Sequence, residues 1–181
     1  MADIDKIVAQ CQKGVRQAQK QLYEEFAPRL FTVCIRYCKN HTEAEDLLHE
    51  GFIKIFEKIE QYRGDGTVFA WLRKIMVNTV LDELRKKREI FYIDDTDIII
   101  KNYADEENEE AGEEDEFGEV DINQVFDLVK QMPERYKLVF NLYIVENYSH
   151  EKIASKLGIS TGTSKSNLSR ARKWLKDRMK K

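Results

Sequence analysis

The sequence contains few residues that interrupt helices and few cysteines. Among its 181 residues are two prolines, eight glycines and three cysteines. Because proline and glycine disfavour helix interiors more than other residues do, their scarcity permits long helices along most of the chain. Three cysteines cannot all pair with one another, and they do not form the even-numbered framework of small secreted proteins. We therefore expect a reducing compartment, the cytoplasm.

Long apolar runs are also missing. No stretch approaches the roughly 20 consecutive apolar residues that cross a bilayer, and residues 1–14 lack the basic and then apolar order of a signal peptide. We therefore expect no direct membrane insertion. Strand-like alternation is scarce, whereas hydrophobic residues make up 42% of the chain, enough to build folded cores. These features predict an all-α protein.

Acidic residues are concentrated in one segment. Residues 105–121 hold eleven Asp and Glu and no Lys or Arg. Removing these eleven from the total of 33 acids leaves 22 against 30 basic residues, so the net charge of −3 hides two basic or neutral halves. A block of like charges repels itself and has too few apolar groups to fold. We expect two small helical domains, at 1–93 and 122–181, joined by a flexible acidic linker at 94–121.

The N-terminal half has the pattern of amphipathic helices. Thr42 followed by Glu45 forms a Thr-x-x-Glu capping box, which predicts the start of a helix. Apolar residues then recur at spacings of three and four along one face: Ala44, Leu48, Phe52, Ile55, Phe56, Ile59 and Tyr62. After a glycine-containing loop, a second helix is expected at 68–88. Its one polar stripe is typical of a ligand-facing surface, and consists of Lys74, Asn78, Asp82 and Arg85.

The C-terminal half has the pattern of a helix-turn-helix. Helices are expected at 123–131 and 134–145, the second with Pro133 in its first turn. Ser149 can cap a third helix that ends at Gly158, a residue suited to a left-handed cap. Ile-Ala-x-x-Leu-Gly-Ile-Ser then leads into a final helix that starts at Ser160 or Thr161. This order of cap, turn and helix is typical of the helix-turn-helix motif.

The final helix is strongly basic. From residue 149 to 181 the chain has ten Lys and Arg and only two acidic residues. Such side chains contact base edges and phosphates when a helix enters the major groove. We expect these residues to face outward: Lys165, Ser166, Asn167, Ser169, Arg170 and Lys173. The alternative is a solvated basic helix with no role in DNA binding.

Two segments resemble the domains of bacterial sigma factors. The promoter-binding C-terminal domain is similar to YSHEKIASKLGISTGTSKSNLSRARKWL, and the core-binding, −10-reading domain is similar to EAEDLLHEGFIKIFEKIEQYRGDGTVFAWLRKIMVNTVLDELRKKR. A chain of only these two domains resembles the extracytoplasmic-function class. The resemblance implies a transcription initiation factor that catalyses no reaction and needs no cofactor. It would join RNA polymerase core, read −35 DNA with one domain, and melt and capture the −10 strand with the other.

The resemblance also assigns partners and surfaces. Its partners would be RNA polymerase core and promoter DNA; an anti-sigma factor is left open, and the free protein would be a monomer. The polymerase would bind the exposed side of the capping-box helix, at Glu45, Asp46, Glu50, Ile53 and Lys54. The −10 strand would contact Tyr62, Arg63, Gly64, Asp65, Thr67, Phe69, Lys74, Asn78, Arg85, Lys86 and Arg88, with Asn78 lining a base pocket. The outward residues of the final helix would read the −35 element, whereas Trp71 is expected to pack in the core.

Three residues depart from the pattern of the family. Ser164 stands where the family usually packs an apolar residue, which would lower the stability of the helix-turn-helix. Asn167 replaces the usual arginine, which weakens the inference of a phosphate contact there. Gly51 stands where a larger residue is common, at a cost of up to about 1 kcal/mol in helix propensity.

Other functions are alternatives to this one. The chain could be an operator-binding regulator whose N-terminal half dimerises or senses a signal. A metal-dependent nuclease would need acids clustered on a rigid element, but the dense acidic cluster lies in the linker. Cys34, Cys38 and His41, with His49 beyond, could bind zinc, although no strong fourth ligand is suitably spaced. We expect no metal site, because the two cysteines fit an apolar helix face equally well.

Overall fold

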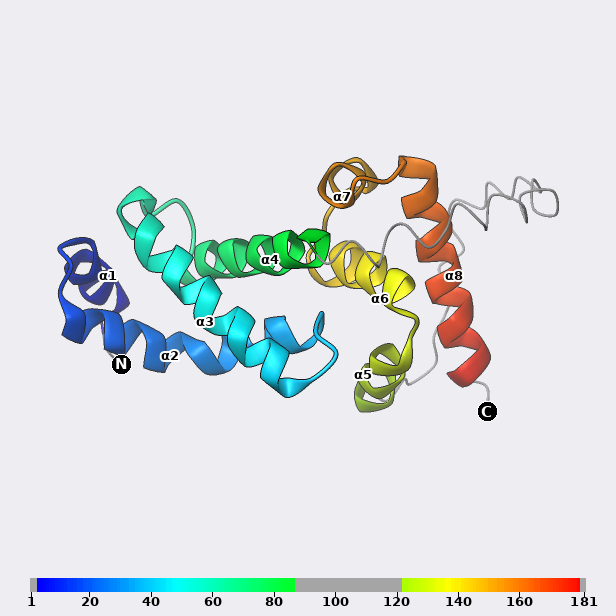
Figure 1. Ribbon diagram of the computed structural model, residues 1–181, viewed down its shortest axis with the longest axis horizontal. Helices are drawn as coiled ribbons and strands as arrows, with labels where there is room; N and C mark the ends of the chain where they lie inside the picture. Colours follow the sequence, from blue (N-terminus) through cyan, green and yellow to red (C-terminus); the bar gives the residue numbers. More distant parts are fainter. Residues whose placement is uncertain (1–2, 87–121, 180–181) are drawn as a thin grey trace. The chain divides into compact units, whose positions relative to one another are not determined.

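The computed structural model describes residues 3–86 and 122–179, which form helices and no strand (Figure 1). The prediction of an all-α fold is confirmed for these residues. The chain divides into two compact units, Met1–Lys86 and Lys87–Lys181, called here the N-terminal and C-terminal domains. The predicted linker and the boundary at residue 93 lie outside the described residues. Within the described residues, no helix has the length and apolar character required to cross a membrane.

Three long helices form the body of the N-terminal domain. Its elements in order are α1 (Ile4–Gln12), α2 (Arg16–Ile35), α3 (His41–Lys58), the short 3₁₀ helix η1 (Ile59–Gln61) and α4 (Val68–Lys86). Helices α2, α3 and α4 pack on one another, and α1 packs on α2 and η1 (Figure 1). The core between them holds fully buried Leu22, Leu30, Ile55, Leu72 and Met76. The apolar stripes predicted from the sequence therefore face one shared interior.

Helix α3 begins earlier than the predicted capping box. Its N-cap is Asn40, whose Oδ1 accepts a hydrogen bond from the Glu43 N–H at 2.8 Å. Glu43 reaches back in turn, and its Oε2 accepts from the Lys39 N–H at 2.9 Å. The predicted Thr42–Glu45 cap is therefore wrong by two residues, because asparagine caps a helix at least as well as threonine and precedes it in the chain. The predicted apolar face is confirmed for the five residues that are buried: Ala44, Leu48, Phe52, Ile55 and Ile59.

Gly51 has a packing role that its helix propensity does not reveal. The residue is buried in α3, and a Cβ built on it would overlap the Sδ and Cε atoms of Met76. Met76 is itself fully buried in α4. The glycine thus lets the two helices approach with the methionine between them. The sequence predicted only a loss of stability at this position.

The connection between α3 and α4 is a short glycine-containing loop. Gly64 and Gly66 have φ angles of +85° and +92°, which residues with a Cβ rarely adopt. Thr67 then caps α4, because its Oγ1 accepts from the Ala70 N–H at 3.2 Å. The helix predicted at 68–88 is confirmed as Val68–Lys86, and Arg88 lies outside the described residues.

The C-terminal domain packs three helical segments around its last helix. Its elements are α5 (Ile122–Gln131), α6 (Glu134–Phe140), the π-helical turn η3 (Asn141–Val145), α7 (His150–Leu157) and α8 (Thr161–Met179). Helix α8 packs against α5, α6 and α7 (Figure 1). The helices predicted at 123–131 and 134–145 are confirmed, although the second ends in a wider turn. Pro133 lies at the N-cap and not within the first turn.

The helix-turn-helix forms as the sequence predicted. Ser149 caps α7, with its side chain accepting from the Lys152 N–H at 3.3 Å. Gly158 ends α7 in the left-handed conformation at φ +69°. Ser160 then caps α8, because its Oγ accepts from the Thr163 N–H at 2.9 Å. Of the two predicted starts, the structure therefore selects Ser160 as the cap and Thr161 as the first helical residue.

Candidate nucleic-acid interface

Helix α8 presents a continuous polar and basic surface. The predicted −35 residues that are exposed on it are Lys165, Ser166, Ser169, Arg170 and Lys173. They recur at spacings of one and three residues, which places them on one side of the helix. The opposite side buries Leu168, Ala171 and Leu175 against the rest of the domain. The helix can therefore contact a ligand along its length without losing its packing.

Asn167 does not belong to this surface. Its side chain is only 8% exposed, so the prediction that it faces outward is wrong. The physical reason is helical periodicity, because Asn167 lies three residues after Ser164 and four before Ala171, both of which are fully buried. Its polarity suggested a surface position, but its register in α8 places it inside.

Ser164 is a buried polar residue whose hydroxyl has a defined partner. The Oγ atom lies 2.9 Å from Nδ1 of His150, the first residue of α7. The imidazole also stacks on Tyr143, with ring centroids 4.7 Å apart. A buried hydroxyl without a partner would cost about 1–3 kcal/mol. The hydrogen bond therefore offsets the loss of stability that the sequence predicted at Ser164.

The His150 imidazole lies in a basic environment. Burial, and then the positive charges of Lys165 and Arg172, lower the pKa of His150, while Glu151 opposes them. The neutral imidazole is therefore favoured at neutral pH. Sequence reasoning missed His150, because its contact with Ser164 spans the whole turn of the motif.

The predicted −10 loop has a defined internal structure. The Tyr62 hydroxyl donates to the Gly66 carbonyl at 2.8 Å across the loop. The Tyr62 ring also packs on Trp71, with centroids 5.5 Å apart and planes tilted by 60°. Trp71 is only partly buried and packs on the loop, so the prediction that it packs in the core is wrong. The loop is thus closed by its own first residue, and exposed Arg63 lies at its tip beside Asp65.

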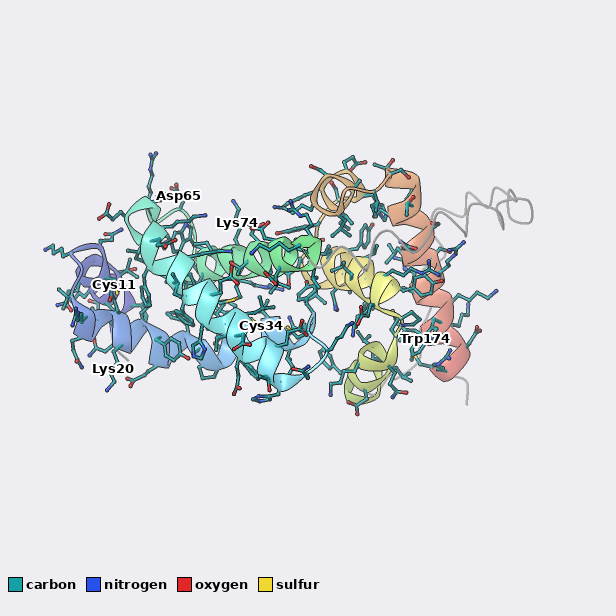
Figure 2. The ribbon with its side chains drawn as sticks, in the orientation of Figure 1. Cys11, Lys20, Cys34, Asp65, Lys74 and Trp174 are labelled. Atoms are coloured by element: carbon teal, nitrogen blue, oxygen red, sulfur yellow. The ribbon has the colours of Figure 1, made fainter. Side chains whose placement is uncertain are left out.

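The exposed residues of the loop and α4 line one edge of the N-terminal domain. Asp65 and Lys74 lie along this edge (Figure 2). Asn78 follows one turn after Lys74 and is partly buried. At the far end of α4, Arg85 pairs with Asp82 at 3.4 Å and Lys86 with Glu83 at 3.2 Å. These exposed ion pairs are weak, so phosphates can compete for both cations.

Phe69 occupies a different environment from the rest of the predicted −10 set. Its ring stacks on Phe26, with centroids 6.3 Å apart, and the Arg29 guanidinium lies 3.8 Å from the ring centroid. The ring is therefore held within a cluster between α2 and α4. Arg29 is an exposed cation that the sequence analysis did not assign, since no local pattern connects it to a residue 40 positions later.

The predicted polymerase-binding face of α3 is exposed and mainly acidic. Glu45 and Asp46 are exposed, and Ile53 is 59% exposed among charged neighbours. Glu50 and Lys54 form an ion pair of 2.8 Å, and the hydrogen bond from Lys54 lowers the pKa of Glu50. The face therefore offers one apolar side chain within a charged surround, as many protein interfaces do.

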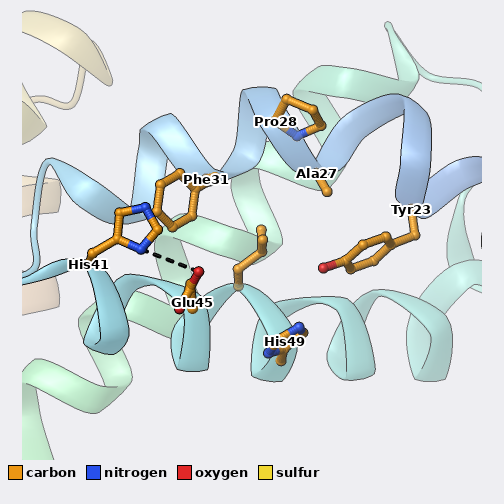
Figure 3. Close-up of a pocket in the computed structure, with 8 residues that line it drawn as sticks. Tyr23, Ala27, Pro28, Phe31, His41, Glu45 and His49 are labelled. Carbon is orange, nitrogen blue, oxygen red and sulfur yellow. Dashed lines mark ion pairs between the residues drawn. The ribbon is translucent and has the colours of Figure 1, made fainter.

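A groove of about 310 Å³ adjoins this face between α2 and α3 (Figure 3). Tyr23, Pro28 and Phe31 line one wall, and the α3 residues opposite them include His41 and Glu45. His41 Nδ1 lies 3.2 Å from a Glu45 carboxylate oxygen, and its ring contacts Phe31 at 4.7 Å between centroids. Glu45 thus belongs both to the predicted face and to the wall of the groove.

The residues of the alternative zinc site lie in two different environments, the interior and the surface. Cys34 and Cys38 are buried at 0% and 8% exposure, whereas His41 is exposed and pairs with Glu45. Burial, and secondarily Cys38, raises the pKa of the Cys34 thiol to about 12, which disfavours the thiolate that binds metals. Among residues 3–86 and 122–179, no three His, Cys, Asp or Glu side chains are grouped to hold a metal ion.

Comparison with known proteins identifies both domains. The family Sigma-70 region 2 matches residues 22–90, and Sigma-70, region 4 matches residues 122–175. The chain is 31% identical to the RNA polymerase sigma factor SigV of Bacillus subtilis over 151 residues, covering 83% of this chain and 84% of SigV. It is 25% identical to the ECF RNA polymerase sigma factor SigW of the same organism, covering 98% and 97%.

A solved structure shares the fold. CnrH, determined in complex with the cytosolic domain of CnrY, superposes with a TM-score of 0.50 at 18% identity, covering 98% of both chains. At this identity the likeness shows the fold alone. The two family matches and the similarity to SigV show the family as well as the fold. The chain belongs to the extracytoplasmic-function class of RNA polymerase sigma factors and acts in transcription initiation.

Proposed function

We propose that the protein acts by binding, with three surfaces that have separate partners. The exposed side of α8 reads −35 duplex DNA, the 62–67 loop and α4 hold the −10 strand, and the exposed face of α3 docks on RNA polymerase core. The observation that carries the proposal is the surface of α8. It gathers Lys165, Ser166, Ser169, Arg170 and Lys173 on the outside of a capped helix-turn-helix, with no acidic residue among them.

The chemistry of α8 suits a major groove. Lysine and arginine can bond to guanine O6 and N7 or to phosphates, and serine can bond to either kind of group. The capped N-terminus of α8 also directs the positive end of the helix dipole toward the approaching phosphates. Asn167, which is buried, does not contribute to this reading.

The −10 surface would work by holding an unstacked base. Removing a base from its stack costs a few kcal/mol, so the loop must supply contacts that duplex DNA does not offer. The partly buried Asn78 can both donate to and accept from a base edge. Lys74, Arg85 and Lys86 would neutralise the phosphates of the captured strand.

The partners follow from these surfaces. RNA polymerase core and promoter DNA are the proposed ligands, and no step of this mechanism needs a cofactor or a chemical reaction. The protein would act in the cytoplasm, where the polymerase is, and would be monomeric before it joins the core. An anti-sigma factor would act by covering one of the three surfaces, and occlusion of α3 would be sufficient.

The test is a reconstitution with purified core polymerase. Promoter fragments are first selected with the assembled holoenzyme, and transcription from them is then measured with and without the protein. Transcription that requires the protein, and that falls when Arg170 is replaced by Ala, supports the proposal. Lys130→Ala, which changes an exposed basic residue of α5 in the same domain, outside the proposed surface, is the matched control. Tight operator binding by a dimer with no polymerase dependence would instead support the regulator.

A further inference from the structure

Gln12 links α1 to the start of the −10 loop. Its side-chain Nε2 donates two hydrogen bonds of 3.1 Å, one to the Ile59 carbonyl and one to the Tyr62 carbonyl. Both acceptors are backbone carbonyls, so only the amide nitrogen, with its two N–H groups, can satisfy them together. The contacts span 47 and 50 residues of sequence and are partly buried. One side chain thus holds both ends of the turn that precedes the loop.

Near its entry the loop has two further restraints, since the Tyr62 N–H donates to the Ile59 carbonyl at 3.2 Å and the Tyr62 ring packs on Trp71. Gly64 and Gly66 give its backbone wide conformational freedom. Within the loop, Tyr62 donates to the Gly66 carbonyl, and at the exit Thr67 caps α4. Because the Tyr62 hydroxyl closes the loop, the position of the whole loop depends on where the Tyr62 backbone is held. Gln12 holds that backbone directly.

Helix α1 is anchored firmly enough to act as the support. Ile7, Val8 and Cys11 are buried at 7%, 3% and 2% exposure on its inner face. The helix is capped at its start by Asp3, whose side chain accepts from the Lys6 N–H, and it packs on both α2 and η1. The match to Sigma-70 region 2 begins at residue 22, so α1 lies outside the matched segment. The support for the loop therefore comes from a part of the chain that the family match does not include.

We infer that α1, through Gln12, positions the −10 loop to accept an unstacked base. Gln12 is a positioning residue in this scheme and does not touch DNA. The inference rests on the proposed role of the loop. A loop already held in its binding geometry loses less conformational entropy when a base enters, which raises affinity without any new contact. The same restraint sharpens the discrimination between bases, because the pocket cannot shift to fit the wrong one.

The test compares three full-length variants with the wild type. Gln12→Met removes both donors and keeps the length of the side chain. Gln10→Met makes the same change at an exposed position of α1. Cys11→Ala loosens the packing of α1 but keeps the Gln12 amide, so it shows what a merely structural weakening does.

Two measurements are made on each variant. Hydrogen exchange of the free protein reports the opening of residues 59–67 relative to the core of α2 and α3. Binding of the holoenzyme to a labelled single strand, carrying the −10 sequence of a promoter selected with the wild type, gives the affinity. Repeating the binding with each of the three other bases at every position in turn identifies the captured base and gives the ratio of affinities for the right and the wrong base there, called the discrimination ratio.

Gln12→Met should raise exchange in the loop while the α2 and α3 amides stay protected, and should lower the discrimination ratio by about three- to tenfold. Gln10→Met and Cys11→Ala should keep the wild-type ratio. A wild-type ratio in Gln12→Met, or an equal loss in Cys11→Ala, would overturn the inference. A wild-type holoenzyme that shows no preference at any position would instead reject the −10 role of the loop, before any variant is compared.

Discussion

The hydrogen bond between His150 and Ser164 is expected to make a measurable contribution to the stability of the C-terminal domain. Ser164→Ala removes the Oγ atom from a site with 0% exposure and leaves His150 Nδ1 without its partner at 2.9 Å. A neutral hydrogen bond contributes about 0.5–1.5 kcal/mol net, and an unsatisfied buried group costs about 1–3 kcal/mol. Because His150 is only partly buried, water can replace some of the lost bond. We therefore expect a loss of about 1–2 kcal/mol.

The assay can isolate this domain, because the chain has two tryptophans, one in each domain. In a Trp71→Phe background, the fluorescence of Trp174 in α8 follows unfolding of the C-terminal domain in urea. The double-mutant cycle of Ser164→Ala with His150→Ala removes the contribution of the Tyr143 stacking from the coupling, since that stacking is absent in both His150 variants. A coupling of about 1 kcal/mol is expected, and a value below about 0.3 kcal/mol, the usual error of additivity, would refute the reasoning.

The same histidine makes the stability of the C-terminal domain depend on pH. The pKa of His150 is lowered in the folded protein by burial and by Lys165 and Arg172, and returns to about 6.5 in the unfolded chain. As the pH falls through about 6.5, the unfolded chain takes up a proton at His150 before the folded protein does. The free energy of unfolding therefore decreases below this pH and has its full value above it. His150→Ala should flatten this slope below about pH 6.5. An unchanged slope would show that another group titrates.

Three further changes test the fold and the DNA surface. Asn40→Ala should destabilise the N-terminal domain by about 1 kcal/mol, whereas Thr42→Ala should have little effect. Trp71 fluorescence in a Trp174→Phe background measures both, and a larger loss in Thr42→Ala would show that Thr42 is the cap. Gly51→Ala should destabilise the same domain by about 1–2 kcal/mol despite its better helix propensity, and should do so much less in a Met76→Ala background, where the overlapping atoms are gone. Lys165→Ala should weaken promoter binding and reduce the slope of log K against log salt by about 1, whereas Lys130→Ala on α5 should leave the slope unchanged.

The helix-turn-helix could be predicted because its signals are local. Ser149, Gly158 and Ser160 each act within four residues of the backbone groups that they satisfy. The cap of α3 was predicted wrongly for a related reason. Asn40 and Thr42 are both good caps two residues apart, and sequence alone does not say which one forms.

Asn167 and Gly51 show where residue type misleads. An amide in a basic helix suggests exposure, but the register of α8 determines burial, and residue 167 falls on the inner side. A glycine in a helix suggests instability, yet the neighbouring helix uses the space that its missing Cβ leaves to Met76. In both cases the deciding fact is which surface faces which, and that requires the packed helices.

The contacts that the sequence could not reveal have a common form. In the N-terminal domain, the Gln12 amide reaches across about 50 residues to hold the backbone before the proposed −10 loop. In the C-terminal domain, the His150 imidazole reaches 14 residues to hold Ser164, which lies directly beside Lys165 on α8. Neither side chain is predicted to contact DNA. Each one, however, fixes the position of a segment that is predicted to contact DNA. Since an unsatisfied polar group in a partly buried site is costly, each contact favours one position of its segment over all others. How well the two proposed DNA-binding surfaces discriminate between sequences would then depend on polar side chains that support these surfaces and do not contact DNA themselves.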